Sequence, residues 1–316
     1  MSSTILRLGT RASLLATTQA GHVAADIRAR MGVEVELVEI STHGDVNRDQ
    51  PLAQLGGTGV FVSALRDALL DGRVDLAVHS LKDLPTEPAE GIELAAVPPR
   101  EDPRDVLVAR DGLTLGELPP GSVVATGSLR RASQLRALGL GLEVVGLRGN
   151  IDTRLGKVTS GEVDAVVLAR AGLARTGKTD LVTETIDPIQ MLPAPGQGAL
   201  AVECRSSDAE LAQALRTHLD DETTRAAVTA ERAVLRTLEA GCSAPVGALA
   251  EVAEDTDGGF EVWLRAVVLS EDGSVDMRRS ATGPIAEAVE TGTRLGNGML
   301  HEGAAELIDS PLRRQH

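Results

Sequence analysis

The sequence predicts an α/β protein with two doubly wound domains and a small α+β third domain that holds a three-stranded antiparallel sheet. Through the first two thirds of the 316 residues, short β-branched runs alternate with helical apolar patterns, which is the rhythm of a doubly wound sheet. A proline-rich tract at 99–103 and a proline- and glycine-rich tract at 191–198 interrupt that rhythm and predict chain crossings. After residue 221 the pattern changes to one long helix, three β-like runs and a last helix.

The first series of elements alternates strands and helices. In its second helix, Phe61, Leu65 and Leu69 recur every four residues and form one apolar face. The polar, glycine-rich residues 41–59 that precede this helix predict a loop. The expected strands are Ile5–Leu8, Val33–Ile40, Val74–Val78 and Ile92–Val97, and the expected helices are Leu14–Met31 and Phe61–Leu70.

The second series follows the first crossing, and after the second crossing a strand at Ala199–Glu203 is expected to rejoin the first sheet. This order predicts a discontinuous first domain at 1–98 and 199–217, an inserted second domain at 104–192 and a third domain at 221–316. The second domain is expected to contain strands Val106–Ala109, Val123–Ala125, Leu142–Leu147 and Val163–Leu168, with helices from about Ser128 and Asn150. The third is expected to contain a helix at about Glu222–Glu239, strands Val246–Val252, Glu261–Leu269 and Ser274–Gly283, and a last helix to about Ile308.

Composition argues against several kinds of partner. The chain has a formal net charge of −15 and three aromatic residues, so it lacks the basic surface and the stacking platforms of nucleic-acid-binding proteins. No apolar run approaches the ~18 residues of a membrane span, and the first residues show no signal-peptide pattern. Two cysteines and scattered histidines offer neither a disulfide framework nor a metal site. We therefore expect a cytoplasmic monomer with no metal, no nucleic-acid partner and no membrane partner.

Residues 126–157 carry the strongest signal for a ligand. Six cations and two acids give this stretch a charge of +4, and arginine's rigid fork of donors matches carboxylates and phosphates. Basic and hydroxyl residues lie in the turns that lead from a strand into a helix. The N-terminus of a helix offers unpaired N–H groups, and open α/β sheets bind their ligands at these turns. Alternatively, Ser13, Ser128 and Asn150 are ordinary helix caps and the arginines are solvated. The turns concerned are Gly9–Ser13, Thr126–Arg131 and Arg148–Asn150.

Two single residues are candidates for chemistry. Asp83 ends another expected strand beside Lys82, where a carboxylate can stabilise a cationic transition state or handle a proton. An aspartate before Leu-Pro is also ordinary turn chemistry. Cys242 lies in a loop and can act as a nucleophile, whereas Cys204 is expected in the core of a strand. No catalytic triad can be traced around Cys242.

Residues Gly172–Thr179 match the phosphate-binding loop pattern G-x-x-x-x-G-K-[ST] letter for letter. That motif requires a helix that begins at its lysine, here Lys178. The residues that follow are β-branched and end at Pro188. We therefore expect no nucleotide hydrolysis.

Taken together, the motifs resemble the porphobilinogen deaminase (hydroxymethylbilane synthase) family over residues 8 to about 247. The resemblance implies a transferase of tetrapyrrole and heme biosynthesis that condenses four porphobilinogen molecules head to tail, with loss of ammonia, into hydroxymethylbilane. It also implies two domains that resemble periplasmic anion-binding receptors. The alternative is a non-catalytic small-anion-binding protein with the same two-domain cleft. The resembling segments are Leu8–Ala16, Val78–Thr86, Thr126–Arg131, Leu147–Leu155, Pro195–Leu200 and the loop at Gly241-Cys242.

The resemblance further implies a dipyrromethane cofactor held by a thioether to Cys242, and a catalytic carboxylate at Asp83. The family's loop lysines are replaced here by Gln54 and Thr58, and no motif includes Arg136 or Lys157. The other implied cofactor-binding residues are Lys82, Arg130, Arg131, Ser128, Thr126, Ser80 and Gly149. The implied substrate-binding residues are Arg11, Ser13, Arg148, Arg154, Arg175, Gln197 and Phe61.

Overall fold

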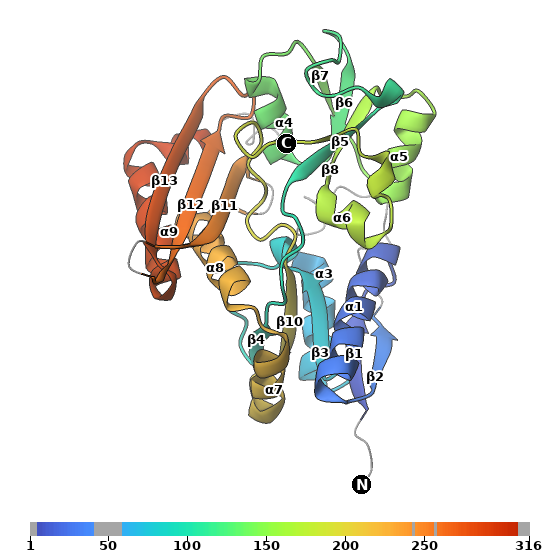
Figure 1. Ribbon diagram of the computed structural model, residues 1–316, viewed down its shortest axis with the longest axis vertical. Coiled ribbons are helices and arrows are strands. Elements are labelled where there is room, and N and C mark those ends of the chain that lie inside the picture. Colours follow the sequence, from blue (N-terminus) through green and yellow to red (C-terminus); the bar gives the residue numbers. More distant parts are fainter. Residues whose placement is uncertain (1–4, 41–58, 242–243, 256–257, 309–316) are drawn as a thin grey trace. The chain divides into compact units, whose positions relative to one another are not determined.

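A computed structural model describes residues 5–40, 59–241, 244–255 and 258–308, without the side chains of 59–61. The chain forms two compact units, residues 1–101 with 199–225 and residues 102–198 with 226–316. It therefore leaves the first unit at 101–102, returns at 198–199 and leaves again at 225–226. Figure 1 labels most of the elements of both units. None of the described helices has the length and hydropathy needed to cross a membrane.

The first unit is built on a five-stranded mixed sheet in the order β2-β1-β3-β10-β4. Strand β1 is parallel to β2 and β3, whereas β10 is antiparallel to β3 and β4. The predicted return of a strand near residue 199 to the first sheet is thus confirmed. The strands are β1 (Leu6–Thr10), β2 (Val35–Glu39), β3 (Leu76–Ser80), β4 (Ile92–Ala96) and β10 (Leu200–Arg205).

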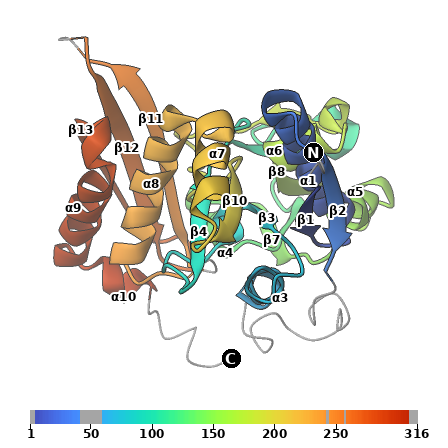
Figure 2. The same cartoon turned by 90° about the horizontal axis from the view of Figure 1, so that it is seen from below.

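Helices cover both faces of this sheet, so the first unit is doubly wound as predicted. Buried residues of α1 (Leu14–Met31) and α7 (Ala209–Leu219) share one apolar cluster with the sheet. Buried residues of α3 (Gly59–Leu70) form a separate cluster with the opposite face. Figure 2 shows α3 on one side of the strands and α1 and α7 on the other. Helix α7 was not predicted.

The second unit contains another five-stranded mixed sheet, in the order β7-β6-β8-β5-β9. Strand β6 is parallel to β7 and β8, and β5 is antiparallel to β8 and β9. Leu135 of α4 joins a cluster on one face, and Leu155 of α5 and Leu173 of α6 join a cluster on the other. The elements are β5 (Asp105–Ala109), β6 (Val123–Thr126), α4 (Leu129–Ala137), β7 (Glu143–Gly146), α5 (Ile151–Thr159), β8 (Ala165–Ala169), α6 (Arg170–Arg175) and β9 (Glu184–Thr185).

The rest of the chain forms a three-stranded antiparallel sheet in the order β11-β12-β13, as predicted. Alternate residues of β12 from Val262 to Val268 lie in one apolar cluster with α8, α9 and α10. The predicted last helix is two helices, because Gly303 has a positive φ of 95° between them. The elements are α8 (Glu222–Thr237), β11 (Val246–Glu254), β12 (Phe260–Leu269), β13 (Asp276–Pro284), α9 (Ala288–His301) and α10 (Ala304–Ile308).

Candidate active site

The first unit places its candidate residues at one edge of its sheet. Strands β1 and β3 are parallel neighbours, so the turns that follow them lie at the same edge. Arg11 and Ser13 follow β1 in the chain. Ser80 ends β3, and Lys82 and Asp83 follow it in a 3₁₀ turn at Leu81–Asp83.

Helix α1 connects the two turns. Ser13 caps this helix by accepting a hydrogen bond from the Ala16 N–H at 3.4 Å, so the interpretation of Ser13 as a helix cap is confirmed. Further along α1, Nε2 of the buried Gln19 donates to Oγ of Ser80 at 2.9 Å. Gln19 was missed in the sequence. Gln19 lies four residues before Val23, which lies four before Ile27, so this spacing places its amide on the buried face of the helix. A buried amide needs a polar partner, and that need was the available signal.

The turn that holds Asp83 is tied to the neighbouring strand. The Leu81 N–H donates to the Ala199 carbonyl at 3.0 Å, and the Leu84 N–H donates back to the Leu81 carbonyl at 3.1 Å. Lys82 and Asp83 are both partly buried. The backbone at Asp83 is therefore held at the end of β3 by hydrogen bonds on both sides.

A buried ion cluster lies on the strands that lead to this turn. Both oxygens of Glu203 in β10 accept from Arg66 of α3, at 2.6 and 3.0 Å, and Nε2 of His79 lies 3.2 Å from Glu203 Oε2. Burial raises the pKa of Glu203, but His79 and Arg66 outweigh that effect and lower the pKa to about 2. The cluster joins α3 to β3 and β10. Its histidine, His79, directly precedes Ser80 in β3.

In the second unit, the parallel strands β6, β7 and β8 end at one edge of their sheet. At the end of β6, the hydroxyl of Thr126 accepts from the Ser128 N–H at 3.2 Å. Ser128 precedes α4, but its side chain makes no capping hydrogen bond. After β7, the Asn150 side chain accepts from the Thr153 N–H at 2.8 Å and caps α5. Asn150 is thus an ordinary cap, whereas Ser128 occupies the N-cap position of α4 without a capping hydrogen bond to its side chain.

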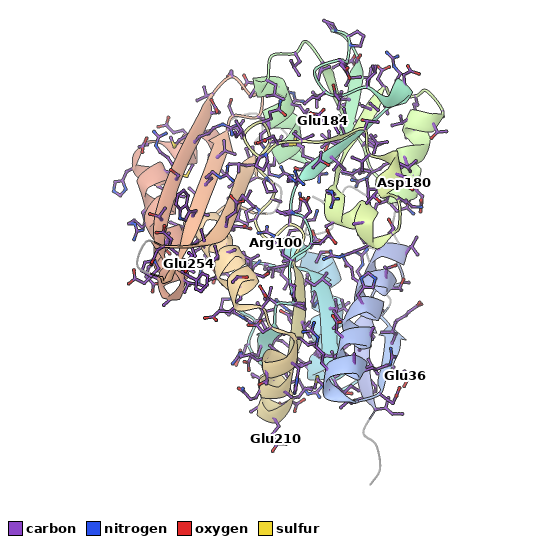
Figure 3. The ribbon with its side chains drawn as sticks, in the orientation of Figure 1. Glu36, Arg100, Asp180, Glu184, Glu210 and Glu254 are labelled. Atoms are coloured by element: carbon purple, nitrogen blue, oxygen red, sulfur yellow. The ribbon has the colours of Figure 1, made fainter. Side chains whose placement is uncertain are left out.

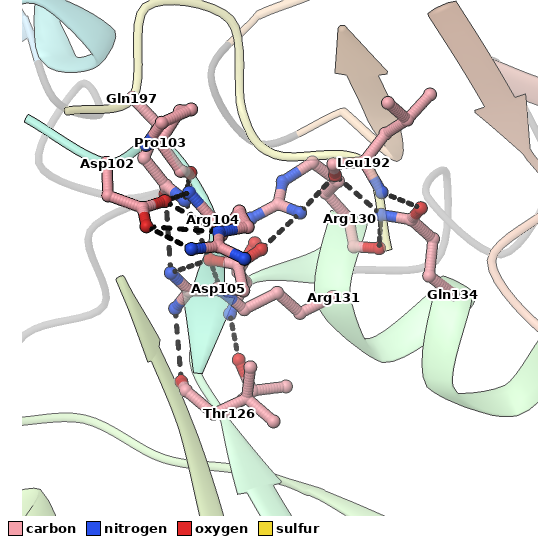
Figure 4. Close-up of polar contacts among 12 residues, drawn as sticks. Asp102, Pro103, Arg104, Asp105, Thr126, Arg130, Arg131, Gln134, Leu192 and Gln197 are labelled. Carbon is pink, nitrogen blue, oxygen red and sulfur yellow. Dashed lines mark hydrogen bonds and ion pairs between the residues drawn. The ribbon is translucent and has the colours of Figure 1, made fainter. Parts of the chain in front are cut away.

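Arg130 and Arg131 of α4 are buried around one carboxylate (Figure 4). Their side chains are 4% and 6% exposed, so the interpretation of these arginines as solvated is wrong. Nη1 of Arg130 lies 2.8 Å from Asp105 Oδ2, and Nη2 of Arg131 donates to Asp105 Oδ1 at 2.7 Å. Burial raises the pKa of Asp105, but the two arginines outweigh it and hold that pKa well below its usual range.

Arg154 adds a partly buried cation to the same edge. Its Nε donates to the Gly149 carbonyl at 2.8 Å, and burial and the charge of Arg131 both lower its pKa. A Cβ atom at Gly127 would lie 2.5 Å from the Leu147 carbonyl oxygen and 3.7 Å from Nη2 of Arg154. Only glycine therefore allows the turn after β6 to pack this closely against the Leu147 carbonyl, which follows β7.

The remaining candidates of this unit differ in their surroundings. Arg148 is exposed. Arg175 donates to the Gly198 carbonyl at 2.6 Å, and the buried Gln197 donates to Asp105 at 2.8 Å. The two cations that no motif includes have partners elsewhere: Arg136 donates to the Glu271 carbonyl, and Lys157 forms an ion pair with Glu162.

Some residues singled out in the sequence lie wholly or partly outside what the structure describes. Cys242 is outside the described residues, as are Gln54 and Thr58, and for Phe61 only the backbone, in α3, is described. The described residues that flank Cys242 are joined, because the Ala244 N–H donates to the Gly241 carbonyl at 2.9 Å. On α8, which precedes this loop, Glu231 accepts from the Gly196 N–H at 2.6 Å and from the Ala250 N–H at 2.9 Å.

Two alternatives from the sequence are resolved. In the segment that matches a phosphate-binding loop, no α-helix begins at Lys178, which forms an ion pair with Asp152 at 3.0 Å. The helix that the phosphate-binding motif requires is therefore not formed in this segment. Cys204 is buried in β10, and its burial, together with Glu93 and Asp208, raises the pKa of its thiol to about 11. Its assignment to a strand core is also confirmed.

Charge is distributed unevenly over the described residues. Many acids are exposed, such as Glu36 of β2, Glu210 of α7 and Glu254 of β11, whose side chains point away from the ribbon in Figure 3. In the second unit, Arg130 and Arg131 share the buried carboxylate of Asp105, and Arg154 makes no ion pair among the described residues. Positive charge therefore exceeds negative charge among these residues.

Comparisons with known proteins agree with these motifs. Two family models match the chain: "Porphobilinogen deaminase, dipyromethane cofactor binding domain" over residues 6–213 and "Porphobilinogen deaminase, C-terminal domain" over residues 225–301. A porphobilinogen deaminase from Nocardia farcinica is 58% identical over 97% of this chain and 89% of its own length. One from Mycobacterium tuberculosis is 59% identical over 96% of this chain and 98% of its own.

Among solved structures, a periplasmic substrate-binding protein of an ABC transporter from Coxiella burnetii has a TM-score of 0.43 at 16% identity, covering 67% of this chain and 91% of its own. An ancestral cationic amino acid solute-binding protein has a TM-score of 0.44 at 18% identity, covering 67% of this chain and 87% of its own.

Proposed function

This chain belongs to the porphobilinogen deaminase family, and from that membership we propose how its own residues carry out the family's reaction. The chain is a transferase of heme biosynthesis with a dipyrromethane cofactor. Its reaction condenses four porphobilinogen molecules head to tail, with loss of ammonia, into the linear tetrapyrrole hydroxymethylbilane. The family rules against the alternative of a non-catalytic small-anion-binding protein.

The buried arginines fit such a cofactor. A dipyrromethane built from two porphobilinogen units carries an acetate and a propionate on each ring, so its charged groups are all carboxylates. Arg130 Nε is buried and has no hydrogen-bond partner among the described residues. Arg154 is partly buried and makes no ion pair within the described ranges. Unused guanidinium N–H groups and uncompensated positive charge are what a carboxylate ligand would satisfy. This surplus of charge is the observation that carries the proposal.

We assign the binding roles as follows. When bound, the dipyrromethane supplies the primer end to which the first substrate molecule is added. The residues that hold it are Cys242, Lys82, Ser80, Thr126, Ser128, Arg130, Arg131 and Gly149. The residues that bind the carboxylates and rings of the substrate are Arg11, Ser13, Arg148, Arg154, Arg175, Gln197 and Phe61.

Two residues act on the reacting atoms in this proposal. When ammonia leaves porphobilinogen, the C–N bond breaks and an electrophilic methylene carbon remains, with positive charge shared by the pyrrole nitrogen. Asp83 stabilises that cationic nitrogen and holds its proton. Cys242 provides a soft thiolate, which attacks such a methylene carbon and forms a C–S bond that water does not cleave.

The intact mass of the purified protein tests the attachment. We expect a mass above that of the sequence by one dipyrromethane, and we expect the variant Cys242→Ala to lack this excess. Cys204→Ala is the matched control and keeps the adduct, because the Cys204 thiol is buried and its pKa is raised to about 11. An unmodified mass in freshly made, active wild-type protein would refute the thioether at Cys242.

We also propose three functional domains, at 1–98 with 199–217, at 104–192 and at 221–316, each with a sheet of its own. A cytoplasmic monomer without nucleic-acid or membrane partners fits the acidic composition and the scarcity of cysteine. Light scattering coupled to size exclusion is expected to give the mass of one chain. A stable dimer in that measurement would contradict the monomer.

A further inference from the structure

Asp105 lies at the centre of the arginine cluster, although no motif contains it. It is the first residue of β5 and is 0% exposed. Its Oδ1 accepts from Nε of Arg131 at 3.0 Å, from Nη2 of Arg131 at 2.7 Å and from Nε2 of Gln197 at 2.8 Å. Its Oδ2 lies 2.8 Å from Nη1 of Arg130. One carboxylate therefore contacts two guanidinium groups and an amide, as Figure 4 shows.

These contacts restrict the two arginines to different degrees. The guanidinium of Arg131 also donates to the Val167 carbonyl at 3.1 Å and to Gln197 Oε1 at 3.4 Å, so protein groups surround it. The guanidinium of Arg130 donates to the Leu192 carbonyl at 2.5 Å, but its Nε has no hydrogen-bond partner among the described residues. Asp105 is the only carboxylate that the described ion pairs give to either arginine.

The cluster holds more positive charge than an ion pair needs for stability alone. One arginine would neutralise Asp105, and a buried ion pair is in itself weak evidence for stability. A second buried arginine with an unused N–H is costly unless a further anion binds to it. The carboxylate thus lowers the charge of the arginine pair to +1 and leaves donors available.

We propose that Asp105 is a positioning residue of the carboxylate-binding site, which orients the guanidinium groups of Arg130 and Arg131 and sets their combined charge. This inference rests on the proposed function, because it takes the two arginines as holders of the dipyrromethane. Without Asp105, two buried cations repel each other and lose their common acceptor. The arginine pair then meets the carboxylates of its ligand in a less defined geometry.

The test follows cofactor attachment in the full chain. Wild type, Asp105→Asn and Asp105→Ala are prepared from cells that cannot make porphobilinogen and are then given porphobilinogen, and the rate of the mass increase is measured. We expect attachment to slow by about tenfold or more in both variants, as for other residues that orient a binding group. Asp164→Asn is the matched control, since Asp164 pairs with Arg110 in the same unit and is 26% exposed. It is expected to attach the cofactor at the wild-type rate.

Formate and formamide separate positioning by charge from a purely structural role. Asp105→Ala leaves room for a molecule the size of the lost carboxyl group, so formate is expected to restore attachment and the neutral formamide is not. Equal effects of the two molecules, or wild-type rates in Asp105→Asn, would overturn the inference. If Asp105→Ala does not fold, the attachment rate of Asp105→Asn alone tests the inference, because asparagine keeps the shape of aspartate. If wild type itself gains no adduct, the assigned attachment fails instead.

Discussion

At the scale of single residues, the basic residues between 126 and 157 look alike in the sequence but differ in the structure. Arg130 and Arg131 share a buried carboxylate, and Arg154 is held by a backbone carbonyl. Arg136 and Lys157 pair elsewhere. The positive charge of these residues and their motifs predicted an anion site. The pairing of Arg130 with Arg131, however, depends on Asp105, which comes from the distant strand β5. No local pattern marks that contact.

A prediction at this scale concerns Asp83. Asp83→Asn keeps the shape and removes the negative charge that stabilises a cationic pyrrole nitrogen, so we expect kcat to fall by about 10²-fold or more. Cofactor attachment, measured by intact mass, is expected to fall much less. Asp71→Asn is the control, because Asp71 is exposed and pairs with Arg73. Near-normal turnover in Asp83→Asn would remove this residue from the catalytic role.

At the scale of elements, most strands and helices were predicted to within two or three residues, because their apolar periodicity reflects which face is buried. Helix α1 was predicted with its observed ends, at Leu14–Met31. Helix α7 was missed, since two of its three buried positions, Leu215 and Leu219, lie among polar residues and the third is an alanine. The insertion of β10 between β3 and β4 also required the structure, because strand order depends on distant segments.

The cluster at Glu203 gives a prediction at this scale. Its pKa is lowered from 4.5 to about 2, so its stabilising effect is complete above pH 4.5 and is lost as the pH falls towards 2. We expect this carboxylate to account for on the order of 3 kcal/mol of the free energy of unfolding lost in that range. Glu203→Gln is expected to be less stable at pH 7 and to lose less on acidification.

Urea unfolding followed by circular dichroism at pH 7, 4 and 3 measures this difference. Glu302→Gln is the control, because Glu302 is exposed in its ion pair with Arg279 and should leave the pH dependence as it is in wild type. Parallel pH curves for wild type and Glu203→Gln would show that the cluster does not supply the acid-sensitive stability.

At the scale of the whole molecule, an acidic chain keeps a local excess of buried arginine. Each compact unit has a five-stranded sheet whose fourth strand runs antiparallel to its neighbours and directly follows a crossing of the chain. Tertiary structure therefore brings β5, with Asp105, and the tract with Gln197 to the arginines of α4. The positive charge of these arginines that Asp105 does not neutralise affects the stability of the apo-protein.

We predict that the apo-protein unfolds at a lower temperature than the loaded protein, because the cofactor's carboxylates neutralise the buried arginines. Porphobilinogen added to wild-type apo-protein is expected to raise Tm by several degrees, since each kcal/mol shifts Tm by about 2–4 °C in units of this size. Cys242→Ala, which cannot hold the adduct, should show a much smaller shift. Equal shifts in the two proteins would mean that the attached cofactor does not stabilise the fold.

The sequence by itself determined the fold class, the alternation of elements and the family, because periodicity and long motifs are local properties of the chain. It also placed positive charge at the strand-to-helix turns. Only the tertiary structure decided that Asp105 contacts Arg130 and Arg131, that Gln19 meets Ser80, and that Arg136 and Lys157 have other partners. The physical reason is that a buried charge or amide needs a partner, and here the partners come from strands and helices far away in the chain.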